Sequence, residues 1–183
     1  AFAQITEALE IARELDDKYE IGGSLVHLGT VACEQHEYVH AASLYQEGLA
    51  LFQELGAEWD IADALHYLGQ AVRLQGDYPR AWALFRESLA RWRVLGISQW
   101  GWISECLDGL ATLCASQRQF VEAVRLAGAA DALRTAIGMS TASSHSSFRG
   151  DLTEARTQLD EAVFVAAWAE GYALSSEQAM DYA

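Results

Sequence analysis

The clearest candidate for bond-breaking chemistry in this sequence is the string from His36 to His40, which spells HExxH. In metalloproteases this string places two histidines one turn apart on a continuous helix, where they bind zinc while the glutamate activates a zinc-bound water. A zinc site of this kind also needs a third ligand, and none is evident in the sequence. The secondary structure that contains this string therefore decides whether it can form a zinc site.

A second candidate is the segment 139–147, MSTASSHSS, in which several serines surround His145. A serine nucleophile needs a histidine base that a third group orients. Serine-rich segments without helical periodicity are typical of loops, which do not fix such a geometry. We expect a loop here and no catalytic residues.

The segment 58–96 predicts two amphipathic helices joined by a tight turn at Gly76-Asp77. Asp77 is the expected N-cap of the second helix, and Pro79 falls in its first turn, where a missing N–H does no harm. Segment 17–56 repeats the pattern 40 residues earlier. The identical pairs are Ile21/Ile61, Leu25/Leu65, Leu28/Leu68, Gly29/Gly69, Tyr38/Tyr78, Ala41/Ala81, Leu44/Leu84, Leu49/Leu89 and Leu55/Leu95.

The same pattern extends in both directions along the chain. Residues 1–16 match only the second helix of a unit, with Leu15 on its apolar face, and 97–138 form a further unit after a two-residue insertion near Ser98 and Gln99. Gly29, Gly69 and Ala111 lie mid-helix, where glycine costs about 1 kcal/mol relative to alanine unless a close approach requires it. Repetition at this period predicts an all-α, right-handed superhelical array of antiparallel helix pairs over 1–138.

The alignment of the repeats also decides how the HExxH string is interpreted. His36 and Glu37 fall where Gly76 and Asp77 lie, so the first half of the string is expected in a turn and only His40 within a helix. We therefore interpret these residues as turn residues and expect neither a metal nor a catalytic site.

Residues 148–183 are expected to cap the array after the loop 139–147. The pattern predicts one helix over 148–158 and another from its N-cap Asp160 to Glu170, with Gly171 as C-cap. Ser175 and Gln178 have capping-box spacing and predict a short terminal helix.

Tryptophans give a further prediction. Trp92 replaces Phe52 at an equivalent position and is expected in the core. Trp59, Trp100 and Trp102 lie at the entrances of first helices, where they either pack between repeats or form an aromatic binding patch. Packing is the favoured interpretation.

Composition restricts the partners. The 12 basic and 26 acidic residues give a net charge of -14, which disfavours nucleic acids and anionic membranes as partners. Cys33, Cys106 and Cys114 fall in apolar helical stretches, as expected of reduced thiols in a cytoplasmic protein. Because the chain starts at Ala1 within a helical pattern, we expect it to be a piece of a longer protein.

A candidate binding groove follows from placing the first helices in one register. A mixed polar strip then contains Val26, Thr30, Asp63, His66, Gln70, Arg73, Glu105, Asp108 and Thr112. Arg73 could pair with a carboxylate and Gln70 with a backbone amide of a bound peptide. The alternative is an ordinary solvated face, and the sequence does not choose between the two.

The order Leu65, Leu68, Gly69, Gly76-Asp77-Tyr78, Ala81, Phe85 and Leu89 resembles the tetratricopeptide repeat in its form of about 40 residues. Residues 166–183 resemble the end of the repeat region in large bacterial signal-transduction ATPases, including regulators of LuxR type. This resemblance implies an interaction arm of a transcriptional regulator. The chain has no GxxxxGK[ST] phosphate loop and no recognisable helix-turn-helix, so ATP hydrolysis and DNA binding do not carry over.

The leading hypothesis is a noncatalytic scaffold without a cofactor, whose groove binds a protein segment or a neighbouring domain of the same protein. The alternative is a sensor domain that binds a small-molecule effector. An enzyme is the third hypothesis, and it depends on the HExxH string alone.

Overall fold

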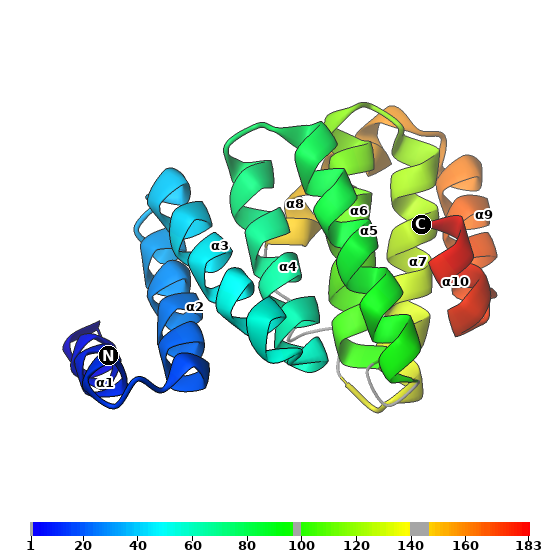
Figure 1. Ribbon diagram of the computed structural model, residues 1–183. Helices are drawn as coiled ribbons and strands as arrows, with labels where there is room; N and C mark the ends of the chain where they lie inside the picture. Colours follow the sequence, from blue (N-terminus) through cyan, green and yellow to red (C-terminus); the bar gives the residue numbers. More distant parts are fainter. Residues whose placement is uncertain (1, 97–99, 140–146) are drawn as a thin grey trace. The chain divides into compact units, whose positions relative to one another are not determined.

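The structure is a computed structural model that describes residues 2–96, 100–139 and 147–183, and the side chains of all of these except 100 and 147–151. Within these ranges the regular secondary structure is all helical, without strands. The helices are α1 (Phe2–Glu14), α2 (Lys18–Glu34), α3 (Tyr38–Leu55), α4 (Glu58–Leu74), α5 (Tyr78–Leu95), α6 (Trp100–Ser116), α7 (Phe120–Ala136), α8 (Ser147–Gln158), α9 (Glu161–Tyr172) and α10 (Ser176–Tyr182) (Figure 1). They form two compact units, Ala1–Arg91 and Trp92–Ala183.

Left-handed residues end the helices of the repeats at a regular spacing. Positive φ angles recur at Asp16, His36, Gly56, Gly76, Gly96, Arg118 and Gly138. The interval is 20 residues, lengthened to 22 once between Gly96 and Arg118. A left-handed residue after the last helical turn reverses the chain, and glycine adopts it without a steric penalty. The repeat in the sequence is therefore a repeat of turns as much as of apolar side chains.

Consecutive helices of the first unit pack side by side in pairs, as Figure 1 shows for α2, α3 and α4. The mid-helix glycines lie at close approaches between helices, as predicted. A Cβ atom on Gly29 would lie 2.6 Å from the ring of Tyr45, and one on Gly69 would lie 3.0 Å from the ring of Phe85. The small residue on each first helix thus makes room for an aromatic ring of the second.

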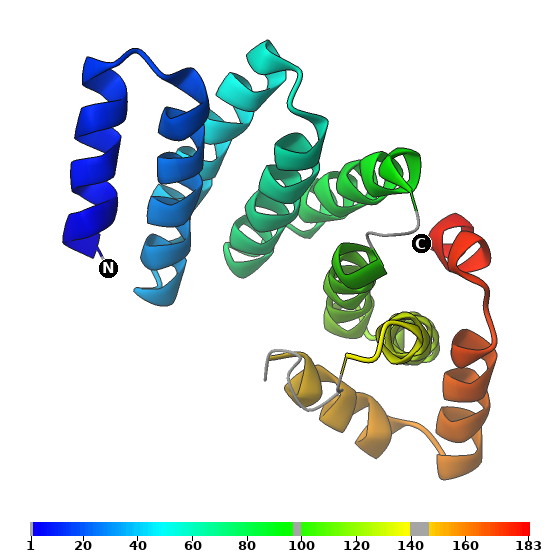
Figure 2. The same cartoon turned by 90° about the horizontal axis from the view of Figure 1, so that it is seen from below.

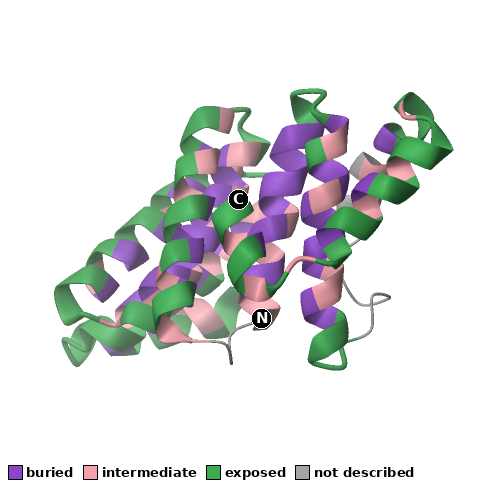
Figure 3. Ribbon diagram, turned by 90° about the vertical axis from the view of Figure 1, so that its right-hand side faces the viewer, coloured by how far each residue is buried: buried purple, intermediate pink, exposed green. Residues whose placement is uncertain are grey.

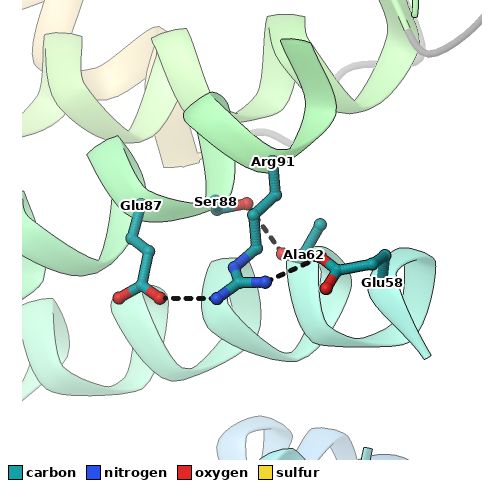
Figure 4. Close-up of polar contacts among 5 residues, drawn as sticks. All are labelled: Glu58, Ala62, Glu87, Ser88 and Arg91. Atoms are coloured by element: carbon teal, nitrogen blue, oxygen red, sulfur yellow. Dashed lines mark hydrogen bonds and ion pairs between the residues drawn. The ribbon is translucent and has the colours of Figure 1, made fainter. Parts of the chain in front are cut away.

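Polar contacts fix how α5 lies on α4 (Figure 4). The hydroxyl group of Ser88 is fully buried and donates a hydrogen bond of 2.7 Å to the carbonyl oxygen of Ala62. Arg91 joins Glu58 on α4, at 2.7 Å, to Glu87 on α5, at 3.2 Å. A buried hydroxyl needs such a partner, so Ser88 sets the axial position of one helix against the other.

Aromatic stacking and small residues build the core of the second unit. The fully buried ring of Trp92 stacks on Trp102 with centroids 5.7 Å apart, which confirms Trp92 as a core residue and assigns Trp102 to packing. Trp59 lies in the first unit and is 40% exposed, so its ring is only partly used for packing. Buried positions lie on the facing sides of neighbouring helices, as the purple segments in Figure 3 show.

The last three helices do not repeat the pairing of α6 with α7. Helix α9 packs extensively on α7, whereas α8 and α9 touch each other little and form an L around α7 (Figure 2). Short α10 begins with the predicted capping box, in which Ser175 and Gln178 bond each other's backbone N–H groups. Ion pairs of Arg93 with Asp181, at 2.6 Å, and with Glu177, at 3.2 Å, hold α10 to the last turn of α5.

Two predicted details were wrong. Gly171 is not the C-cap of α9, because the helix continues to Tyr172 and Ala173 is the C-cap. The backbone at Gly171 instead lies directly against Arg125 of α7, so a packing contact requires this glycine. Leu15 does not belong to the buried face of the first helix, because α1 ends at Glu14 and Leu15 is 73% exposed.

Several expectations fall outside the described residues, namely the insertion at 98–99, most of the serine-rich segment and the side chain of Trp100. Asp77 caps α5 as predicted, since its carboxylate accepts a hydrogen bond of 3.3 Å from the backbone N–H of Arg80. None of the described helices combines the length and apolar character that a bilayer crossing requires.

Candidate interaction surface

The HExxH string lies across the turn between two helices, as the repeat alignment predicted. Helix α2 ends at Glu34, His36 has a φ of 63° and α3 begins at Tyr38. The ring of His36 bonds the Tyr38 hydroxyl at 2.7 Å, and that of His40 contacts Glu37 at 3.3 Å. Among the residues with described side chains, no group of three histidine, cysteine or carboxylate side chains could hold a metal ion. The geometry required of a zinc protease is therefore not present at this string.

An ordered aromatic and polar face lies where the first helices α2 and α4 meet. Tyr45 of α3 stacks on Tyr67 of α4, with centroids 5.6 Å apart and an interplanar angle of 16°. The Tyr45 hydroxyl donates a hydrogen bond of 3.3 Å to Oγ1 of Thr30 on α2. The buried ring of Tyr45 from α3 therefore links Thr30 of α2 to Tyr67 of α4.

Gln70 and Arg73 extend this patch along α4. Nε of Arg73 donates a hydrogen bond of 3.2 Å to Oε1 of Gln70, one turn earlier on the helix. Burial raises the pKa of the Cys33 thiol, and a hydrogen bond with Tyr45 and the charge of Arg73 only partly oppose it. Burial likewise raises the pKa of the Tyr45 phenol. Both groups stay protonated at neutral pH, so Arg73 is the charged group of the patch.

We call the half-buried residues Thr30, Tyr67, Gln70 and Arg73 the α2/α4 patch, and the fully buried ring of Tyr45 lies beneath it. Three of its members were predicted from the sequence, whereas Tyr67 and the buried Tyr45 beneath it were missed. The unit 17–56 has Tyr45 where the next unit has Phe85, and that next unit has Tyr67 where 17–56 has His27. The available signal was therefore an aromatic residue that replaces a different residue type at the same repeat position.

Two other predicted groove residues of the first unit, Val26 and His66, lie deeper. Val26 is 8% exposed and His66 is 4% exposed, with its ring 5.7 Å from that of Phe85. Asp63 is half-buried on α4. The structure therefore brings Thr30, Gln70 and Arg73 together at the patch and places Val26 and His66 in the interior.

The predicted residues of α6 belong to the second unit. Asp108 forms an ion pair of 2.6 Å with Arg134 of α7, and the two side chains are 16% and 6% exposed. Thr112 is buried and its hydroxyl donates to the backbone oxygen of Asp108 at 3.0 Å, while Glu105 is half-buried. Burial raises the pKa of Asp108 to about 6 even though Arg134 lowers it. Asp108 thus has a structural partner that the sequence analysis missed.

Arg134 could have been found from the repeats. It occupies the position of Phe52 and Trp92 in the earlier units, and Asp108 occupies that of Val26 and His66. A buried charge needs a partner of opposite sign. Two charged residues at two core positions of the same unit are the signal of a buried ion pair.

Comparison with known proteins assigns a family to the middle of the chain. Residues 60–136 match the tetratricopeptide repeat family. The match runs from α4 to α7, and the described residues form an all-α, tetratricopeptide-like array of helix pairs. Tetratricopeptide domains generally mediate protein–protein interaction. No curated protein and no solved structure gave a match to the chain.

Proposed function

We propose that this tetratricopeptide-like chain is a noncatalytic scaffold that binds a segment of a partner protein through the α2/α4 patch. The observation that carries the proposal is the set of different chemical groups on this patch, where Tyr67, stacked on the buried ring of Tyr45, lies beside the Gln70–Arg73 pair. Aromatic rings supply apolar contact area, a glutamine amide can bond a peptide group and an arginine can pair with a carboxylate. The fold supports a protein as the ligand.

The wider groove that includes Glu105, Asp108 and Thr112 remains a prediction. Within the second unit, Asp108 already pairs with Arg134, so it is expected to support the groove wall more than to contact a ligand directly.

The test is affinity capture with the tagged chain from an extract of the source organism, followed by quantitative mass spectrometry. The variant Gln70→Ala/Arg73→Ala should reduce recovery of a specific protein at least tenfold. The matched control is Gln53→Ala/Arg86→Ala, which removes the same residue types from exposed positions on the second helices α3 and α5. Equal recovery with both variants would contradict a role for the patch.

Native mass spectrometry of the freshly purified chain tests the small-molecule alternative. A retained organic mass that disappears in Gln70→Ala/Arg73→Ala would replace the protein segment by an effector. His66 is left unchanged in this design because it is buried, and its truncation would create a cavity.

We also propose that the chain is the interaction arm of a bacterial transcriptional regulator in the cytoplasm. The support is the resemblance of residues 166–183 to the end of the repeat region in regulators of the signal-transduction ATPase class. The complete coding sequence tests it. A GxxxxGK[ST] phosphate loop upstream of the repeats would support the proposal, and an unrelated catalytic domain in its place would contradict it.

A further inference from the structure

An apolar groove lies between α8 and α9, outside the residues that match the repeat family. Its volume is about 700 Å³, and Leu152 and Arg156 of α8 face Phe164, Val165 and Trp168 of α9 across it. The groove exists because α8 and α9 form an L around α7 and touch each other little (Figure 2).

The walls of the groove are ordered. The rings of Phe164 and Trp168 are nearly parallel, with centroids 6.4 Å apart, and the Arg156 guanidinium lies 5.1 Å from the centre of the Phe164 ring. Behind these side chains is a buried cluster that includes Phe120 and Val124 of α7, which holds them in place. In contrast, Val165 is 54% exposed at the groove although it is a large apolar residue.

We propose that this groove binds a basic amphipathic helix of a partner protein. Three features argue for the helical form. The walls are helices, whose backbone groups are satisfied internally, so they offer no edge for an added strand. An extended peptide would leave its own N–H and C=O groups unpaired over an apolar surface, whereas a helix satisfies them within itself. A groove between two helices also fits a third helix by side-chain packing.

The charges favour a basic helix. Between Leu152 and Leu174 there is one basic residue, Arg156, which forms an ion pair of 3.3 Å with Glu161. Glu154 and Asp160 are also exposed in this segment, Glu170 pairs with Arg125 of α7 at 2.6 Å, and the whole chain has a net charge of -14. Lysine or arginine residues beside the apolar face of the partner would meet this negative potential, while a second copy of the acidic chain would be repelled.

The probe for this proposal is a fluorescein-labelled 18-residue helical peptide with leucines at i, i+3, i+4 and i+7 spacing and lysines on the remaining faces. A second peptide has glutamate in place of every lysine. In fluorescence anisotropy titrations, the lysine peptide should bind the chain at least tenfold more tightly than the glutamate peptide. Equal affinities, or no binding of either peptide, would overturn the proposal.

Two variants with the same change of charge locate the site. Val165→Lys puts a charge in the groove, whereas Val163→Lys puts one on the same helix at a residue that is 42% exposed and does not line the groove. Val165→Lys should weaken binding of the lysine peptide at least tenfold and Val163→Lys less than twofold. Equal losses would show that the peptide binds the acidic surface without using the groove.

The same proteins also test whether a second copy of the chain occupies the groove. Circular dichroism and urea midpoints verify that both variants are folded, as expected for partly exposed positions. Sedimentation velocity of the wild type should show a monomer. A dimer that Val165→Lys dissociates would identify a second copy as the occupant and overturn the proposal. Because the α2/α4 patch lies in the other unit, its proposed role stands or fails separately.

Discussion

Gly171→Ala tests a close backbone contact in the second unit, at the crossing of α7 and α9. A Cβ atom on Gly171 would overlap the backbone of Arg125, lying 2.7 Å from its carbonyl carbon, and one on Gly128 would lie 2.5 Å from the carbonyl oxygen of Trp168. Both obstacles are backbone atoms, so no side-chain rotation relieves them. The helices must separate by about 1 Å, which forfeits a quarter to a half of the dispersion energy of the atoms that face each other there.

The expected magnitude follows from two opposing effects. Overpacking of this kind costs typically about 1–3 kcal/mol, and here the rigid backbone places it at the upper end. Alanine regains about 1 kcal/mol of helix propensity over glycine. We expect a net loss of about 2 kcal/mol, or a decrease of about 4–8 °C in the melting temperature for a chain of this size.

The assay is urea unfolding followed by circular dichroism, with hydrogen exchange to assign the change to α9. Gly23→Ala is the matched control, because a Cβ atom on this helical glycine of α2 would meet nothing within 4 Å. The control should be more stable than wild type by about 0.5–1 kcal/mol. In Gly128→Ala/Gly171→Ala the loss should be smaller than the sum of the two single losses, since one separation accommodates both methyl groups. If Gly171→Ala gains stability as Gly23→Ala does, the close crossing of α7 and α9 is refuted.

The remaining predictions concern stability at two sites, the Asp108–Arg134 pair and Arg118. Arg134→Met leaves the buried Asp108 carboxylate without its partner and should cost about 3 kcal/mol at pH 7. The pKa of Asp108 is raised to about 6 from 3.8. At pH values between these two, the Asp108 carboxyl group is therefore mostly protonated in the folded chain and mostly ionised in the unfolded chain. The free energy of unfolding should therefore gain from this group as the pH falls from 7 towards 4, and the loss in Arg134→Met should be smaller at pH 5 than at pH 7; urea midpoints showing a loss independent of pH would contradict this. The variant Asp108→Val/Arg134→Phe restores the residues of the first full unit, Val26 and Phe52, and should be more stable than Arg134→Met. Arg118→Gly replaces a residue with a φ of 61° and should stabilise the chain by about 1 kcal/mol in thermal unfolding, whereas a decrease would mean that the arginine side chain makes a stabilising contact.

The sequence alone determined the helices, their pairing and their turns, because these features depend on local periodicity that repeats. The positions of Gly29 and Gly69 predicted close approaches, and the structure has aromatic rings at both. Alignment of His36 with Gly76 predicted a turn, and His36 has the left-handed backbone that a turn requires. A repeated pattern permits such predictions because each further unit shows again which residue types occupy a given position of a helix or turn.

Tertiary structure decided what differs from the repeat. Gly171 has the sequence context of a helix C-cap, and only the path of α9 across α7 shows that it is a packing residue. His66 follows a core leucine on a helix with a predicted polar face, yet the ring of Phe85 buries it. The angle between α8 and α9, and with it the groove beside Val165, has no counterpart in the repeat. Local periodicity specifies which face of a helix is apolar, but the helix that covers this face is chosen by contacts between residues distant in the sequence, and these depend on the packing of the whole unit.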